Sequence, residues 1–189
     1  QKWTLFPYTT LFRSLDEAEM VHKVTIVPRG QAGGYAVMLP KEDRYFMTKP
    51  ELLDKITGLL GGRVAEEIVF GEVSTGAHND FQRATGIARR MVTEFGMSDK
   101  LGPLQFGQAQ GQVFLGRDLN NEQNYSDKIA YEIDLEIQTI IKDCYARAKN
   151  LLTEHREKLD IIANTLLDVE TLDAEQIKHL IDHGRLPER

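Results

Sequence analysis

Residues 59–85, LLGGRVAEEIVFGEVSTGAHNDFQRAT, join two helical patterns through a short polar segment. The first helix is predicted to begin at Thr48-Lys49-Pro50-Glu51, because threonine followed three residues later by glutamate forms a capping box. The second follows Ser74-Thr75-Gly76 and is predicted to end at Gly96. Both carry apolar side chains at helical spacing. In the first these are Leu52, Ile56, Leu59, Leu60, Val64 and Ile68, and in the second Phe81, Ala84, Ala88, Met91 and Phe95.

Strand-like segments precede this pair of helices, and further helical patterns follow it. Val21–Val27 and Tyr35–Leu39 are short and bounded by proline or glycine, which is typical of strands. Ser126 is predicted to cap the longest helix, after a glycine- and glutamine-rich loop. A fourth helix is expected over about Glu157–Leu167, and a short one after Asp173. The predicted fold is therefore mainly α with a small β element.

The composition excludes several classes of protein. The chain of 189 residues has a formal net charge of −6, which argues against a general nucleic-acid binder. No stretch approaches the roughly 20 apolar residues that cross a bilayer. Cys144 is the single cysteine, so no disulfide forms within the chain, and a reducing compartment is expected.

Residues 1–14 differ from the rest of the chain. They contain Trp3, the only tryptophan, together with Phe6, Tyr8 and Phe12, and they show neither helical nor strand periodicity. We interpret this segment as a non-native leader, to be set aside before the fold is considered. The alternative is a native arm that packs its aromatic side chains on the core.

Two features that suggest chemistry have simpler interpretations. Cys144 lies on the apolar stripe of the longest helix, which is typical of a small core residue. His179 and His183 share one helix face and are spaced to reach one zinc ion, but Leu180 stands where a catalytic glutamate would follow the first histidine. The pair precedes Gly184, so we expect it to interact favourably with a helix C-terminus.

Asp80 is the third candidate, near the start of the second helix of the central pair. Its carboxylate is expected to favour that helix end electrostatically. His78 lies two residues earlier, so the two side chains do not face each other on a helix and cannot chelate one ion.

Several long motifs resemble the peptidase domain of the FtsH family, the membrane-anchored, ATP-dependent zinc metalloproteases. They are VTIVPRG (Val24–Gly30), GGYAVMLP (Gly33–Pro40), the opening stretch Leu59–Thr85, and MVTEFGMSDKLGP (Met91–Pro103). The resemblance covers residues 15–189, which we assign to a helical metallopeptidase domain. It implies protein substrates that are unfolded or membrane-bound, a homo-hexamer, and a place on the cytoplasmic face of the bacterial plasma membrane. ATP would be used by a separate module.

The resemblance also assigns a metal ligand. In that family two histidines of a His-Glu-x-x-His helix and one aspartate hold zinc, and the aspartate position corresponds to Asp80. The fourth position is left to water, from which the glutamate takes a proton. The same resemblance makes Gly33, Gly34, Tyr35, Ala36 and Val37 an edge strand for extended substrate; an ordinary hairpin strand is the alternative.

This sequence departs from the family at the other ligands. The His-Glu-x-x-His helix would lie just before residues 15–20, LDEAEM, where residues 3–14 contain neither histidine nor glutamate and Pro7 would break a helix. We therefore expect no catalytic residue and an incomplete zinc site, with the peptidase domain lacking its first zinc-binding helix. We therefore predict that the chain as written is inactive. A non-enzymatic helical oligomerisation module is the alternative function.

Overall fold

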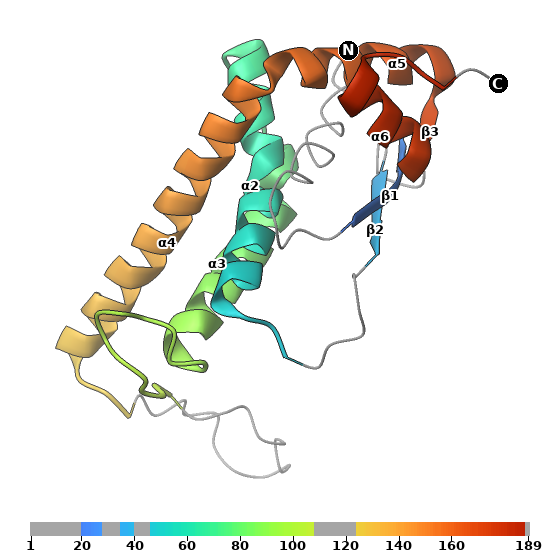
Figure 1. Ribbon diagram of the computed structural model, residues 1–189. Coiled ribbons are helices and arrows are strands. Elements are labelled where there is room, and N and C mark those ends of the chain that lie inside the picture. Colours follow the sequence, from blue (N-terminus) through green and yellow to red (C-terminus); the bar gives the residue numbers. More distant parts are fainter. Residues whose placement is uncertain (1–19, 28–34, 40–45, 108–123, 188–189) are drawn as a thin grey trace, which may run out of the picture.

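A computed structural model describes residues 20–27, 35–39, 46–107 and 124–187. Its long helices are α2 (Lys49–Phe70), α3 (His78–Thr93) and α4 (Asp127–Glu154). They lie side by side, and α3 runs opposite to α2 and α4 (Figure 1). The apolar residues between them include Ile56, Leu60, Met91 and Ile133, all at most 1% exposed.

A small sheet and two shorter helices form the other end of the molecule. The elements are β1 (Met20–Thr25), β2 (Tyr35–Leu39), α5 (Arg156–Val169), β3 (Thr171–Asp173) and α6 (Ala174–His183). The strand order is β2-β1-β3, both pairs being antiparallel. Their apolar side chains join the C-terminal halves of α2 and α4 in a second core cluster. The mainly α fold with a small β element is confirmed.

The starts of α2, α4 and α6 follow the sequence signals closely. Thr48 and Glu51 form the expected capping box of α2, and Asp173 and Gln176 form one at α6. The side chain of Ser126 accepts a hydrogen bond from the backbone of Ile129 at the start of α4. No helix within the described residues is long and apolar enough to cross a membrane.

The predicted end of α3 was wrong by about one turn. The helix stops at Thr93, and Phe95 is 43% exposed instead of lying on the apolar stripe. The Arg90 guanidinium stacks on the Phe95 ring, 4.9 Å from its centre. The backbone then turns at Gly96, whose φ of 60° is left-handed. Since glycine adopts this conformation without the steric cost of a side chain, the turn begins there.

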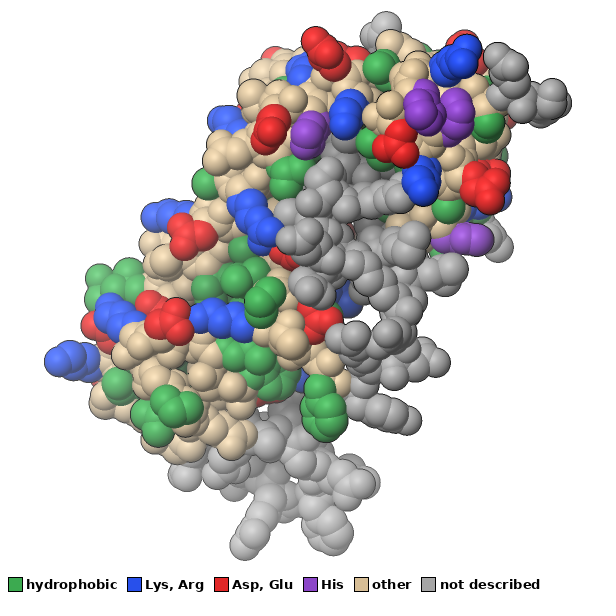
Figure 2. Space-filling view, viewed as in Figure 1, with side chains coloured by type: hydrophobic (Ala, Val, Ile, Leu, Met, Phe, Trp, Pro, Cys, Tyr) green, Lys and Arg blue, Asp and Glu red, His purple; other side chains and the backbone are tan. Residues whose placement is uncertain are grey.

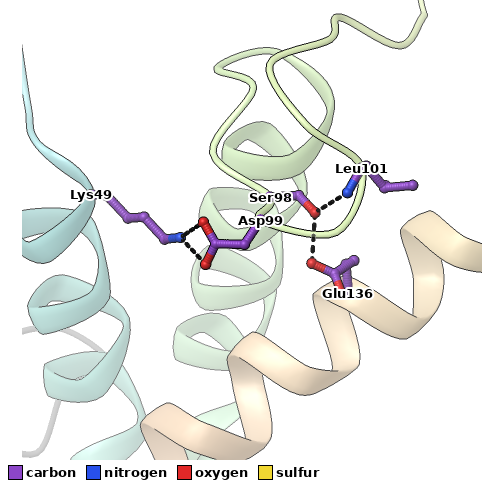
Figure 3. A network of polar contacts seen from close by, with 5 residues as sticks. All are labelled: Lys49, Ser98, Asp99, Leu101 and Glu136. Carbon is purple, nitrogen blue, oxygen red and sulfur yellow. Dashed lines mark hydrogen bonds and ion pairs between the residues drawn. The ribbon is translucent and has the colours of Figure 1, made fainter.

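Side chains hold the loop after α3 against the helices on both sides of it (Figure 3). The Ser98 hydroxyl donates to Glu136 of α4 at 2.6 Å and accepts from the Leu101 backbone at 3.0 Å. Lys49 of α2 donates to both carboxylate oxygens of Asp99 at 2.9 Å. Since Ser98 is 4% exposed, its bond to Glu136 is the shielded part of this network, whereas the Asp99 side chain is 95% exposed.

Two glycines in this loop allow a matched test. A Cβ at Gly96 would lie 2.9 Å from the Pro103 Cα, whereas a Cβ at Gly102, also left-handed with φ 76°, would meet open space. We expect Gly102→Ala to cost about 1–2 kcal/mol for the backbone conformation, and Gly96→Ala to cost about 1–3 kcal/mol more for the steric conflict. Urea unfolding of both variants measures the difference, and equal losses would contradict the close approach of Pro103.

Candidate functional site

Asp80 lies in the first turn of α3, directly after a 3-10 turn, η3 (Thr75–Ala77). The expected position near a helix start is confirmed. Ala77 precedes α3 and supplies no side-chain cap. The Asp80 carboxylate lies in the first turn, where the partial positive charge of the helix is greatest. His78 is exposed, whereas Asp80 is partly buried. These two neighbouring side chains therefore differ in their exposure to solvent.

A polar network from α2 fixes the turn that presents Asp80. The Glu66 carboxylate accepts hydrogen bonds from the Ser74 backbone at 3.1 Å and from its hydroxyl at 2.6 Å. The Arg63 guanidinium donates to the Ser74 carbonyl at 2.8 Å and stacks on Phe81, 4.9 Å from the ring centre. Contacts of these α2 side chains with Ser74 and Phe81 therefore fix the start of α3 against α2.

Arg63 and Glu66 were not predicted from the sequence as part of this site. They lie three residues apart on α2, which places them on neighbouring positions of the helix surface. Their spacing alone is that of an ordinary surface ion pair. The sequence feature that could have identified them is their small separation in sequence from Ser74. Such a short segment allows the chain to turn back onto α2. In addition, the Ser74 hydroxyl accepts from the Gly76 backbone at 3.2 Å, so it caps η3 and not α3.

The Asp80 carboxylate is in an environment that disfavours its charged form. Burial raises the pKa of Asp80, and the positive charge of Arg83 opposes that rise only in part. No hydrogen bond or ion pair within the described part of the chain engages this carboxylate. A bound cation would relieve the desolvation, so Asp80 fits one ligand position of a metal site.

The remaining ligands of such a site are not present in the described residues. No group of three or more histidine, cysteine, aspartate or glutamate side chains is arranged there to hold a metal ion. Zinc sites of hydrolytic enzymes need three protein ligands and one open position. The donor set that the structure describes, with Asp80 alone in place, therefore does not complete a zinc site.

The predicted substrate strand lies at one edge of the sheet. β2 pairs with β1 on one side, from Thr25 opposite Tyr35 to Met20 opposite Leu39, and with no other described strand. The side chains of Tyr35, Ala36 and Val37 are partly buried. Gly33 and Gly34, predicted to belong to the same surface, lie outside the described residues.

The structure places both features with simpler interpretations where the sequence predicted them. Cys144 is 3% exposed, its thiol donates to the Leu53 carbonyl at 3.6 Å, and burial raises its pKa. It lies in the core between α2 and α4, where a thiol kept neutral is a poor nucleophile. His183 occupies the last turn of α6, and Gly184 ends the helix in a left-handed conformation.

Comparison with known proteins extends these observations to a family. Residues 9–180 match the family model described as peptidase family M41. The chain is 84% identical to the ATP-dependent zinc metalloprotease FtsH of Bacillus subtilis (strain 168) over 183 residues, which are 96% of this chain and 29% of the relative. The identity is 72% over 187 residues to the protein of the same name from Alkalihalophilus pseudofirmus, covering 98% of this chain and 28% of that protein.

The match begins at residue 9, within the segment interpreted as a leader, whose origin stays a prediction. The chain spans 29% of the length of its Bacillus subtilis relative. The motifs that suggested the family all lie between residues 24 and 103, inside the matched range. This extent of similarity shows that the chain belongs to peptidase family M41, the family of the FtsH zinc metalloproteases.

Proposed function

We propose that this chain is the peptidase portion of a membrane-anchored, ATP-dependent zinc metalloendopeptidase that degrades unfolded or membrane proteins. In this proposal Asp80 is its described zinc ligand, and the hydrolytic site works in a homo-hexamer on the cytoplasmic face of the bacterial plasma membrane. ATP is used by a separate module of the longer protein. The observation that carries the proposal is the environment of Asp80, on a turn that α2 holds in place.

The fixed turn supports a ligand function because metal sites need oriented donors. Glu66 and Arg63 engage Ser74 from two directions, and this limits the positions that the first turn of α3 can take. A carboxylate needed only for the helix dipole would gain from exposure to water, since burial disfavours its charge. The partial burial of Asp80 therefore supports a role beyond the helix dipole, which we propose to be cation binding.

The edge position of β2 supports binding of extended substrate. An unpaired strand edge can form backbone hydrogen bonds with an unfolded polypeptide and makes little demand on its side chains. In the proposed enzyme, Gly33, Gly34, Tyr35, Ala36 and Val37 form this binding edge, of which the last three are described.

A photo-crosslinking residue at Val37 tests the substrate edge. In a full-length protease of this family, in which residues 15–189 of this chain follow an intact His-Glu-x-x-His helix, we expect it to link to unfolded casein during turnover. The same residue at Tyr131, 63% exposed on α4, is the control and is expected to give no such product. Equal labelling at the two positions would contradict the proposal.

We further propose that the 189-residue polypeptide does not hydrolyse peptides, because its sequence contains no His-Glu-x-x-His motif. The test compares it with a chimera in which residues 1–14 are replaced by the corresponding segment of the Bacillus subtilis relative. A fluorogenic peptide with added zinc is expected to be cleaved by the chimera alone.

Two results would overturn parts of this account. Metal-dependent cleavage by the unaltered 189-residue chain would contradict its inactivity. A chimera that folds, carries the motif and still shows no cleavage would instead favour the alternative, a non-enzymatic helical oligomerisation module. Far-UV circular dichroism of both proteins establishes that the comparison is between folded chains.

A further inference from the structure

The last turns of α6 bring two imidazole rings together at the surface. The ring centres of His179 and His183 are 4.6 Å apart, with an angle of 55° between the ring planes. Figure 2 shows two histidine side chains next to each other, at the end of the molecule where Figure 1 places α6. His183 is exposed and His179 partly buried. Both rings are thus accessible from the same side of a regular helix.

This separation of the ring centres is compatible with two imidazoles that share one metal ion. With metal–nitrogen distances of about 2.0–2.1 Å, two imidazoles at neighbouring positions of one ion have ring centres roughly 4.5–5 Å apart. The observed 4.6 Å lies within this range. Residues four apart on a helix lie one above the other, so the backbone of α6 sets this arrangement without a loop having to close.

A second contact orients one of the rings. The Nδ1 atom of His179 lies 2.6 Å from the backbone carbonyl oxygen of Arg185. Because a carbonyl only accepts hydrogen bonds, Nδ1 carries the proton in this contact, and the lone pair of the neutral ring is then on Nε2. Histidine ligands in metalloproteins commonly use their second ring nitrogen in this way, which fixes the tautomer.

We propose that His179 and His183 form a surface site for one divalent transition-metal ion of the Zn²⁺ and Ni²⁺ class. The Nε2 atoms of the two rings bind the ion, and water occupies its other positions. Imidazole nitrogen suits these ions, whereas Mg²⁺ prefers oxygen ligands. The site is separate from Asp80, and with Leu180 after His179 it has no general base in the zinc-protease pattern. An ion bound by both rings links the last two turns of α6 to each other.

The test is a titration of the tag-free 189-residue chain with Zn²⁺, followed by the ¹⁵N resonances of its imidazole rings. We expect both Nε2 resonances of His179 and His183 to shift together and to saturate at one equivalent. His179→Gln and His183→Gln are each expected to weaken Zn²⁺ binding at this site at least about tenfold, since even partners one step removed from a metal contribute about 10–100-fold. Mg²⁺ is expected to cause no shift.

Two control variants isolate the pair. His22→Gln removes another exposed histidine, on β1, and is expected to leave the affinity unchanged. Asp80→Asn is expected to leave it unchanged as well, which separates this site from the proposed catalytic ligand. A shift of only one of the two rings, or equal affinity in His183→Gln and the unaltered chain, would overturn the proposal.

Discussion

We expect Asp80→Asn to lower the proteolytic rate of a full-length protease of this family, in which residues 15–189 of this chain follow an intact His-Glu-x-x-His helix, by at least about 100-fold. Replacing even a group one step removed from a metal ligand costs about 10–100-fold. Asparagine keeps the size of the side chain and removes the charge that we propose to bind zinc. The loss should appear with unfolded casein and with a short peptide alike, since the hydrolytic step is affected and not the unfolding of the substrate.

A second acidic residue at a helix start provides the control. Asp127 occupies the first turn of α4 and is exposed. If Asp80 served only the helix dipole, Asp80→Asn and Asp127→Asn would each cost about 0.3–1 kcal/mol of stability and leave the rate unchanged. A normal rate in a folded Asp80→Asn protein would therefore contradict the ligand function.

A loss of stability as large as any among the substitutions considered is expected at Leu172, the central residue of β3. Its side chain is fully buried in the cluster that joins the sheet to α5 and α6, and Leu172 pairs with Val24 of β1. Leu172→Ala is expected to cost about 2–5 kcal/mol through lost burial and the cavity left behind. For a chain of this size the fall in Tm is roughly 4–20 °C, measured by calorimetry.

The matched control is Leu167→Ala on α5. That leucine is 57% exposed, so its truncation is expected to change stability by no more than about 0.5 kcal/mol. The comparison keeps the chemistry of the change constant and varies only burial. Similar losses in the two variants would show that the C-terminal helices do not pack on the sheet as described.

The features that the sequence predicted well are those set by neighbouring residues. The capping boxes at Thr48 and Asp173 require contacts only three residues apart, and both are present. Tyr35–Leu39 has the predicted bounds, and the fourth helix, expected over about Glu157–Leu167, spans Arg156–Val169. Local hydrogen bonding and the period of apolar residues are sufficient for these elements.

β3 could not be predicted in the same way. It has three residues, too few for a strand period, and its partner β1 lies at the other end of the chain. The Thr25 hydroxyl lies 2.8 Å from that of Thr171 and donates to the Glu170 carbonyl at 3.1 Å, across 145 residues of sequence. Tertiary packing creates this strand, so only the folded chain shows it.

The candidate site was predictable in part. The position of Asp80 near a helix start follows from the local pattern, and its assignment as a metal ligand rests on the family resemblance. The support from Glu66 and Arg63 depends on how the chain returns to α2 after Gly71, a left-handed turn. That geometry has no periodic signature in the sequence.

The most direct test of the zinc-ligand proposal is the metal content of a full-length protease of this family, in which residues 15–189 of this chain follow an intact His-Glu-x-x-His helix. Zinc is measured by atomic emission after dialysis in the unaltered protein, in Asp80→Asn and in Asp127→Asn, each in a His179→Gln background that removes the proposed surface pair. We expect about one zinc per chain in the unaltered and Asp127→Asn proteins, and far less than one in Asp80→Asn. One tightly held zinc per chain in a folded Asp80→Asn protein would contradict the proposal.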